Sequence, residues 1–214
     1  MGCVLIYFFG DSHTKGLGNQ IADDYTHIPY SVRLAKLLNT DYVMLAELGL
    51  SLNESVDTLI KNLNKIQKDD LVIFQFQTLL NCRYRFDNSG QKFNWKEMDE
   101  VKNISLEDKN LILDFYTKFS SCISKEEVDK VYFLFDYLKS KGVKCKTLYW
   151  CNMDYYVDSE YNISIDDVKY IEMYCKNNVS NVPLFIKDEV GYDDNHLSNP
   201  MNEIIANEIY KKVL

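Results

Sequence analysis

Three residues near the two ends of the sequence form the set that acyl transfer requires. Ser12 lies in segment 10–16, and Asp193 and His196 lie in segment 193–198. A serine hydroxyl is a weak nucleophile until a base removes its proton, and a histidine oriented by a carboxylate is the usual base. The sequence therefore predicts Ser12 as nucleophile, His196 as general base and Asp193 as the group that orients the imidazole.

Other assignments of these roles stay open at this level. His13 is adjacent to Ser12 and is the alternative base, although we expect its side chain to project away from the serine. His27 lies in a polar stretch and is expected to be solvated. Asp194 is the second choice for orienting the base. The plain alternatives are a turn or helix-capping serine and an acidic turn at Asp193.

The two segments also resemble sequence blocks of the GDSL/SGNH hydrolase family. Gly10-Asp11-Ser12 followed by Gly16 is similar to the first block, and Asp193-x-x-His196 is similar to the last. The blocks lie near opposite ends of the chain, so the resemblance covers one domain over residues 1–214. It implies a serine esterase without metal or organic cofactor. The implied substrate is a small-molecule or glycan ester with a short, acetyl-like acyl group.

The resemblance also implies an oxyanion hole, a set of donors aimed at the developing negative charge. The backbone N–H of Ser12 is the first donor. Gly49, in a stretch similar to the second block, is the next, although a shifted register places Leu52 there. Gly10 and Asp11 are expected to support the loop, with Asp11 accepting backbone N–H bonds.

The third block of the family, Gly-x-Asn, is missing from this sequence. Residues 75–81 read Gln-Phe-Gln-Thr-Leu-Leu-Asn, and Leu79 falls where the asparagine is expected. Gln77 or Asn81 could supply the missing amide. Loss of one oxyanion donor typically lowers the rate by ~10²–10³, so this departure bears on the efficiency of hydrolysis.

Composition sets broad limits on partners and location. The net charge is −8 and no Lys/Arg run stands out, which argues against a nucleic-acid surface. The six cysteines show no Cys-x-x-Cys pairing, so we expect reduced thiols, no metal site and a cytoplasmic protein. The apolar run 4–9 is too short to span a membrane and lacks signal-peptide flanks. The oligomeric state is left open.

Apolar segments alternate with helical patterns along the chain. This alternation predicts a three-layer α/β/α sandwich around a five-stranded parallel sheet, of the SGNH or flavodoxin-like type. In such sheets ligands bind at the carboxyl ends of the strands, where Ser12 falls. The expected strands are residues 4–9, 42–45, 71–77, 143–150 and 182–186. The expected helices are 31–38, the segment after the capping box Ser51-x-x-Glu54, the segment after a second box Ser124-x-x-Glu127, 166–175 and the segment from Asn199.

Residues 81–123 interrupt this alternation and are predicted to form an inserted excursion. Such segments often form lids or binding loops, and a helical spacing between residues 111 and 122 predicts one helix inside it. Aromatic and basic residues in and beyond this insertion are candidate substrate contacts. They are Arg83, Arg85, Trp95, Trp150, Tyr155 and Tyr156.

Three rival functions remain compatible with these patterns. The same triad could transfer an acyl group to an alcohol instead of water. A non-catalytic module that binds a glycan or acyl ligand would account for the missing third block. A flavodoxin-like phosphate cradle at residues 10–14 would leave Asp193 and His196 without a role.

Overall fold

The structure of the chain is a computed structural model. It describes residues 4–16, 28–76, 105–149, 160–163, 185–187, 193–197 and 199–213. In residues 185–187 and 193–197 the description covers the backbone alone.

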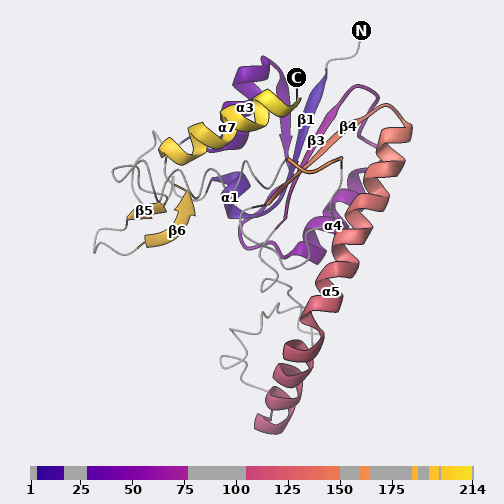
Figure 1. Ribbon diagram of the computed structural model, residues 1–214, viewed down its shortest axis with the longest axis vertical. Helices are drawn as coiled ribbons and strands as arrows, with labels where there is room; N and C mark the ends of the chain where they lie inside the picture. The colour runs from indigo at the N-terminus through magenta and orange to yellow at the C-terminus, as the bar shows by residue number, and fades with distance from the viewer. Residues whose placement is uncertain are drawn as a thin grey trace.

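A parallel four-stranded sheet forms the centre of the described structure (Figure 1). Its strand order is β2-β1-β3-β4, and every neighbouring pair is parallel. Strands covered on both faces are expected to be continuously apolar, and all six residues of β3 are buried. The strands are β1 (Leu5–Phe9), β2 (Asp41–Met44), β3 (Leu71–Phe76) and β4 (Lys144–Tyr149).

Helices cover both faces of this sheet, because successive side chains of each strand point to opposite sides. Ile6 and Phe8 of β1 belong to the core beneath α3 (Tyr30–Leu38) and α7 (Asn199–Val213). Tyr7 and Phe9 belong to the core beneath α4 (Leu52–Asn62) and α5 (Leu106–Ser140). Figure 1 shows the two helix pairs on opposite sides of the strands. The predicted three-layer α/β/α architecture is confirmed.

The fifth predicted strand does not join the parallel sheet within the described residues. β5 (Phe185–Lys187) instead pairs antiparallel with β6 (Asp193–Leu197) in a separate two-stranded sheet. The prediction of a fifth parallel strand over 182–186 is therefore wrong for residues 185 and 186, and residues 182–184 lie outside the description. A short apolar run indicates a strand but does not say which partner the strand will take.

The helix expected to begin after Ser124 begins much earlier. α5 runs without a break over Leu106–Ser140, so the Ser124-x-x-Glu127 pattern lies inside it. A capping-box pattern starts a helix only where the preceding residues leave the helical conformation, and here they do not. The predicted excursion consequently contains the first half of α5, and residue 123 is not a structural boundary. Residues 81–104 lie outside the description, so the lid stays a prediction.

The first turns of α5 extend beyond the sheet in Figure 1, and Leu106 and Leu111 are exposed there.

α4 (Leu52–Asn62) begins at the predicted capping box, where the Glu54 carboxylate accepts the Ser51 backbone N–H at 3.1 Å. Among the described helices, none combines the length and apolarity needed to cross a membrane. The predicted helix 166–175 is outside the described residues.

Candidate active site

Ser12 is the first residue of a short helix, α1 (Ser12–Lys15), which follows the carboxyl end of the central strand β1. Asp11 caps this helix. Its Oδ1 accepts the His13 N–H at 2.9 Å, and its carbonyl accepts the N–H groups of Thr14 and Lys15 at 3.1 and 3.0 Å. Ser12 is half-buried. The turn therefore places a partly accessible serine at the edge of the sheet where parallel sheets bind ligands.

Gly10 makes room for the residues packed beneath this turn. Its φ is 152°, in a region that residues with a Cβ rarely adopt. A Cβ there would lie 2.6 Å from Thr14 Oγ1 and 2.8 Å from Gln75 Oε1. Both distances are shorter than any normal contact, so the turn requires glycine at this position.

Four buried residues form a chain of hydrogen bonds under Ser12, which we call the Thr14 network. The Thr14 hydroxyl donates to Gln75 Oε1 and lies 2.7 Å from the Tyr30 hydroxyl. Because the single Thr14 proton is used by Gln75, the Tyr30 hydroxyl is the donor to Thr14. The Tyr30 backbone N–H donates to Asn202 Oδ1 at 2.8 Å. Burial raises the pKa of Tyr30, so its hydroxyl keeps the proton that it donates.

The sequence analysis missed this network, although one signal for it was present. Gln75 is a polar residue in an otherwise apolar, fully buried strand, and such a residue needs a hydrogen-bond partner. The predicted amide donors are instead Gln77 and Asn81. Both lie outside the described residues, so their proposed role in the oxyanion hole stays a prediction.

Asp193 and His196 both lie on β6, and the structure brings this strand against α1 (Figure 1). The backbone segments that carry the predicted nucleophile and base are therefore neighbours in space. The description of β6 stops at its backbone, so the hydrogen bonds of the triad remain predictions. Asp194 lies on the same strand. His13 lies on α1 beside Ser12, and His27 is outside the described residues.

The loop that carries Gly49 is held next to α1. Gly49 lies in the turn between β2 and α4 with φ 66°, and Glu47 of the same loop forms an ion pair with Lys15. Leu52, the donor in the alternative register, is fully buried as the first residue of α4. The six candidate substrate contacts, Arg83, Arg85, Trp95, Trp150, Tyr155 and Tyr156, are outside the described residues.

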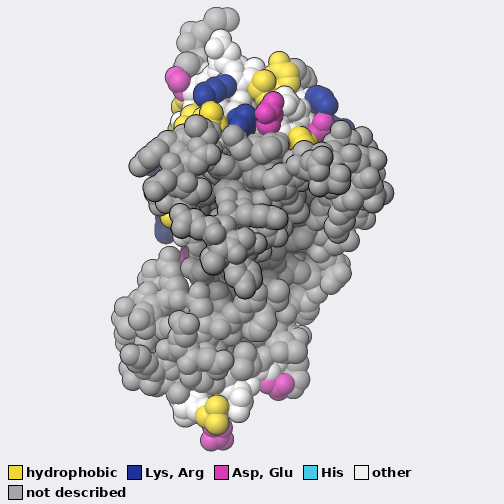
Figure 2. Space-filling view, turned by 90° about the vertical axis from the view of Figure 1, so that its left-hand side faces the viewer, with side chains coloured by type: hydrophobic (Ala, Val, Ile, Leu, Met, Phe, Trp, Pro, Cys, Tyr) yellow, Lys and Arg dark blue, Asp and Glu magenta, His cyan; other side chains and the backbone are white. Residues whose placement is uncertain are grey.

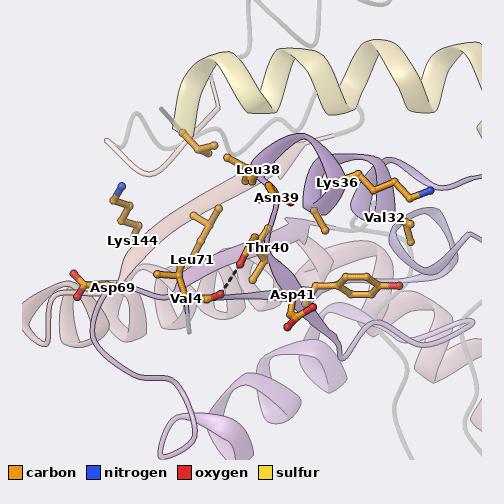
Figure 3. A pocket seen from close by; sticks show the side chains of 14 residues that line it. Val4, Val32, Lys36, Leu38, Asn39, Thr40, Asp41, Asp69, Leu71 and Lys144 are labelled. Atoms are coloured by element: carbon orange, nitrogen blue, oxygen red, sulfur yellow. Dashed lines mark hydrogen bonds between the residues drawn. The ribbon is translucent and has the colours of Figure 1, made fainter. Parts of the chain in front are cut away.

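A cavity of about 840 Å³ lies at the opposite edge of the sheet, where the strands begin (Figure 3). The residues that line it include Val4, which precedes β1, the first residues of β3 and β4, Leu71 and Lys144, and Val213 of α7. Ligands of parallel sheets bind at the other edge, so we do not assign this cavity to the active site.

Within the described ranges, no three His, Cys, Asp or Glu side chains gather to hold a metal ion. On the face shown in Figure 2, acidic and basic side chains of the described residues are interspersed.

No protein-family model and no curated protein matches the sequence. The fold does match solved structures. The Bacillus subtilis protein YXIM matches 100% of this chain and 56% of its own, with 12% identity and a TM-score of 0.51. A lipolytic G-D-S-L family protein from Veillonella parvula matches 97% of both chains, with 10% identity and a TM-score of 0.48. An acetyl xylan esterase matches 99% of this chain and 100% of its own, with 13% identity and a TM-score of 0.48.

The chain shares the fold of the Bacillus subtilis protein YXIM. This likeness lies in the arrangement of the parallel sheet and the helices that cover it. At 10–13% identity this likeness concerns the fold, and the activities of the matched proteins remain theirs. What this chain does depends on its own residues.

Proposed function

We propose that this chain is a serine hydrolase of the SGNH type that cleaves a short, acetyl-like acyl ester, with a carbohydrate as one candidate alcohol. One observation carries the proposal. The half-buried Ser12 stands at the carboxyl end of a central parallel strand, on a helix packed against the strand that bears Asp193 and His196. The predicted location, which is the cytoplasm, belongs to the same proposal.

The chemistry follows from the roles of these groups. Ser12 Oγ attacks the ester carbonyl while His196 removes its proton, and Asp193 stabilises the imidazolium that forms. The tetrahedral intermediate then collapses, and His196 returns the proton to the departing alcohol. Water attacks the acyl-serine in a second cycle and releases the acid. The negative oxygen is held by the N–H groups of Ser12 and Gly49.

The amide of Gln77 or Asn81 completes the oxyanion hole in this proposal. This donor replaces the asparagine of the family's Gly-x-Asn block, which the sequence lacks. Because one donor is worth ~10²–10³ in rate, removal of the amide that fills this role should slow turnover by about that factor. If the acyl group passes to an alcohol instead of water, product analysis will identify the transferase.

Turnover of 4-nitrophenyl acetate by the purified protein tests the proposal. Ser12→Ala and His196→Ala should each reduce turnover to the uncatalysed background, because nucleophile and base act as a unit. His13→Ala should retain activity, which separates the two candidate bases. Ser140→Ala is the matched control, since the exposed Ser140 hydroxyl donates to the nearby Tyr137 carbonyl at 2.7 Å. Undiminished turnover by folded Ser12→Ala protein would contradict the mechanism.

A further inference from the structure

Thr14 and Ser12 lie on opposite sides of the short helix α1. Residues two positions apart in a helix, as Ser12 and Thr14 are, are separated by roughly 200° around the axis, and the burial of the two side chains agrees. Thr14 is fully buried, while Ser12 is half-exposed. Besides the contacts of its hydroxyl, Thr14 accepts the Ser31 hydroxyl on its backbone oxygen at 2.7 Å. Thr14 therefore attaches α1 to the interior through buried hydrogen bonds.

The attachment continues to the other end of the chain. Tyr30, at the start of α3, contacts Thr14 through its hydroxyl and Asn202 through its backbone N–H. Asn202 lies in the first turns of α7, the helix that follows the His196 strand β6, and α3 packs against α7. One series of buried hydrogen bonds consequently joins the helix that begins at Ser12 to the helix that follows His196.

A four-residue helix has too few internal hydrogen bonds to hold its own position, so tertiary contacts must fix it. We propose that Thr14 is a positioning residue whose buried hydroxyl, held between Tyr30 and Gln75, sets α1 so that Ser12 is presented to the His196 segment. This inference rests on the proposed function, because it concerns the reactivity of the same serine.

The expected effect follows from the sensitivity of catalysis to geometry. A displacement of about 1 Å in a reacting group can cost ~10²-fold in rate. Thr14→Val keeps the shape of the side chain and removes its hydroxyl, so Tyr30 loses its acceptor and Gln75 loses its donor. We expect this substitution to slow the reaction of Ser12 with a fluorophosphonate by ~10- to 10²-fold. Thr14→Ser, which keeps the hydroxyl, should restore most of the rate.

The test measures the rate constant for fluorophosphonate labelling of Ser12 by mass spectrometry, at a temperature where circular dichroism shows each variant fully folded. Thr147→Val is the matched control. Thr147 is equally buried and bonds the Asn162 side chain at 2.6 Å, but it lies on β4, which β3 separates from the strand that leads into α1. Turnover of 4-nitrophenyl acetate provides a second readout, in which Thr14→Val should lower kcat more than it changes KM.

Three outcomes separate the possibilities. Slower labelling in Thr14→Val, recovery in Thr14→Ser and an unchanged rate in Thr147→Val support the inference. Equal rates in folded Thr14→Val and wild-type protein, or an equal loss in Thr147→Val, overturn it while leaving the proposed function intact. A folded wild-type protein that is not labelled at Ser12 overturns the proposed function and this inference with it. If Thr14→Val does not fold, Tyr30→Phe removes the same network's donor hydroxyl and must slow labelling at least several-fold.

Discussion

Replacement of Gly10 by alanine should disrupt the turn that presents Ser12. The new Cβ would stand 2.6 Å from Thr14 Oγ1, 2.8 Å from Gln75 Oε1 and 3.0 Å from Gln75 Cβ. Because Thr14 and Gln75 are fully buried and hydrogen-bonded to each other, neither can move aside without breaking that bond. The backbone adds a penalty of its own, since φ is 152° at this position.

The magnitude can be worked from these terms. A backbone conformation that is unfavourable for a residue with a Cβ costs ~1–3 kcal/mol. Breaking the buried Thr14–Gln75 bond leaves polar groups without partners, at ~1–3 kcal/mol. Alanine recovers ~0.4–1 kcal/mol by restricting the unfolded chain. We therefore expect Gly10→Ala to lower the free energy of unfolding by about 1–6 kcal/mol.

Urea denaturation followed by circular dichroism measures this loss, with Gly142→Ala as the matched control. Gly142 also has a positive φ, 82°, but a Cβ there meets only the flexible side chain of Lys68, at 3.0 Å. The control should lose only the backbone term of ~1–3 kcal/mol, less the same ~0.4–1 kcal/mol recovered in the unfolded chain. If Gly10→Ala unfolds at the same urea concentration as Gly142→Ala, the collision with the Thr14 network is not a real constraint.

Two further predictions concern the interior away from the active site. Asp70→Ala should lower the free energy of unfolding by ~2–4 kcal/mol, because the buried carboxylate accepts the N–H groups of Leu5 at 2.9 Å and Gln67 at 2.7 Å. An unchanged urea midpoint would show that these two bonds do not stabilise the fold. Burial raises the pKa of the Cys145 thiol to about 12, and the thiolate is the reactive form. Cys145 should therefore resist iodoacetamide at pH 8 in the folded protein and react once urea unfolds it, and rapid alkylation of the folded protein would contradict this.

The layers of the fold could be predicted because burial on two faces leaves a clear pattern in the sequence. The apolar runs of β1 and β3, and the helical spacing of α3 and α7, each reflect the side that the element turns to the core. The start of α4 followed from its capping box, which is a local feature. Local patterns of this kind depend only on residues close in the sequence.

What the sequence did not predict depends on partners far along the chain. The antiparallel pairing of β5 with β6 is a choice between partners, and the apolar run 182–186 carries no information on that choice. The continuity of α5 through Ser124 similarly overrides a local start signal. The Thr14 network joins four elements through hydrogen bonds between residues up to 172 positions apart. No short stretch of the sequence therefore contains the whole network.

In the candidate site, too, features set by nearby residues could be predicted, and features set by residues distant in the sequence could not. The position of Ser12 at the end of a strand followed from the chain order, and the structure places α1 against β6. The pairing of His196 with Ser12 remains a prediction because the description of β6 stops at its backbone, and the amide that completes the oxyanion hole remains one because residues 77 and 81 lie outside the description.

The most direct test of the central claim is the site of covalent labelling by a fluorophosphonate probe, located by peptide mass spectrometry. We predict a single adduct on Ser12 in the folded protein, and its loss in His196→Ala but not in His13→Ala. Such a result would establish an activated nucleophile and its base together. A folded protein that carries no adduct, or one that carries it on another serine, would contradict the hydrolase proposal and favour a binding module on the same fold.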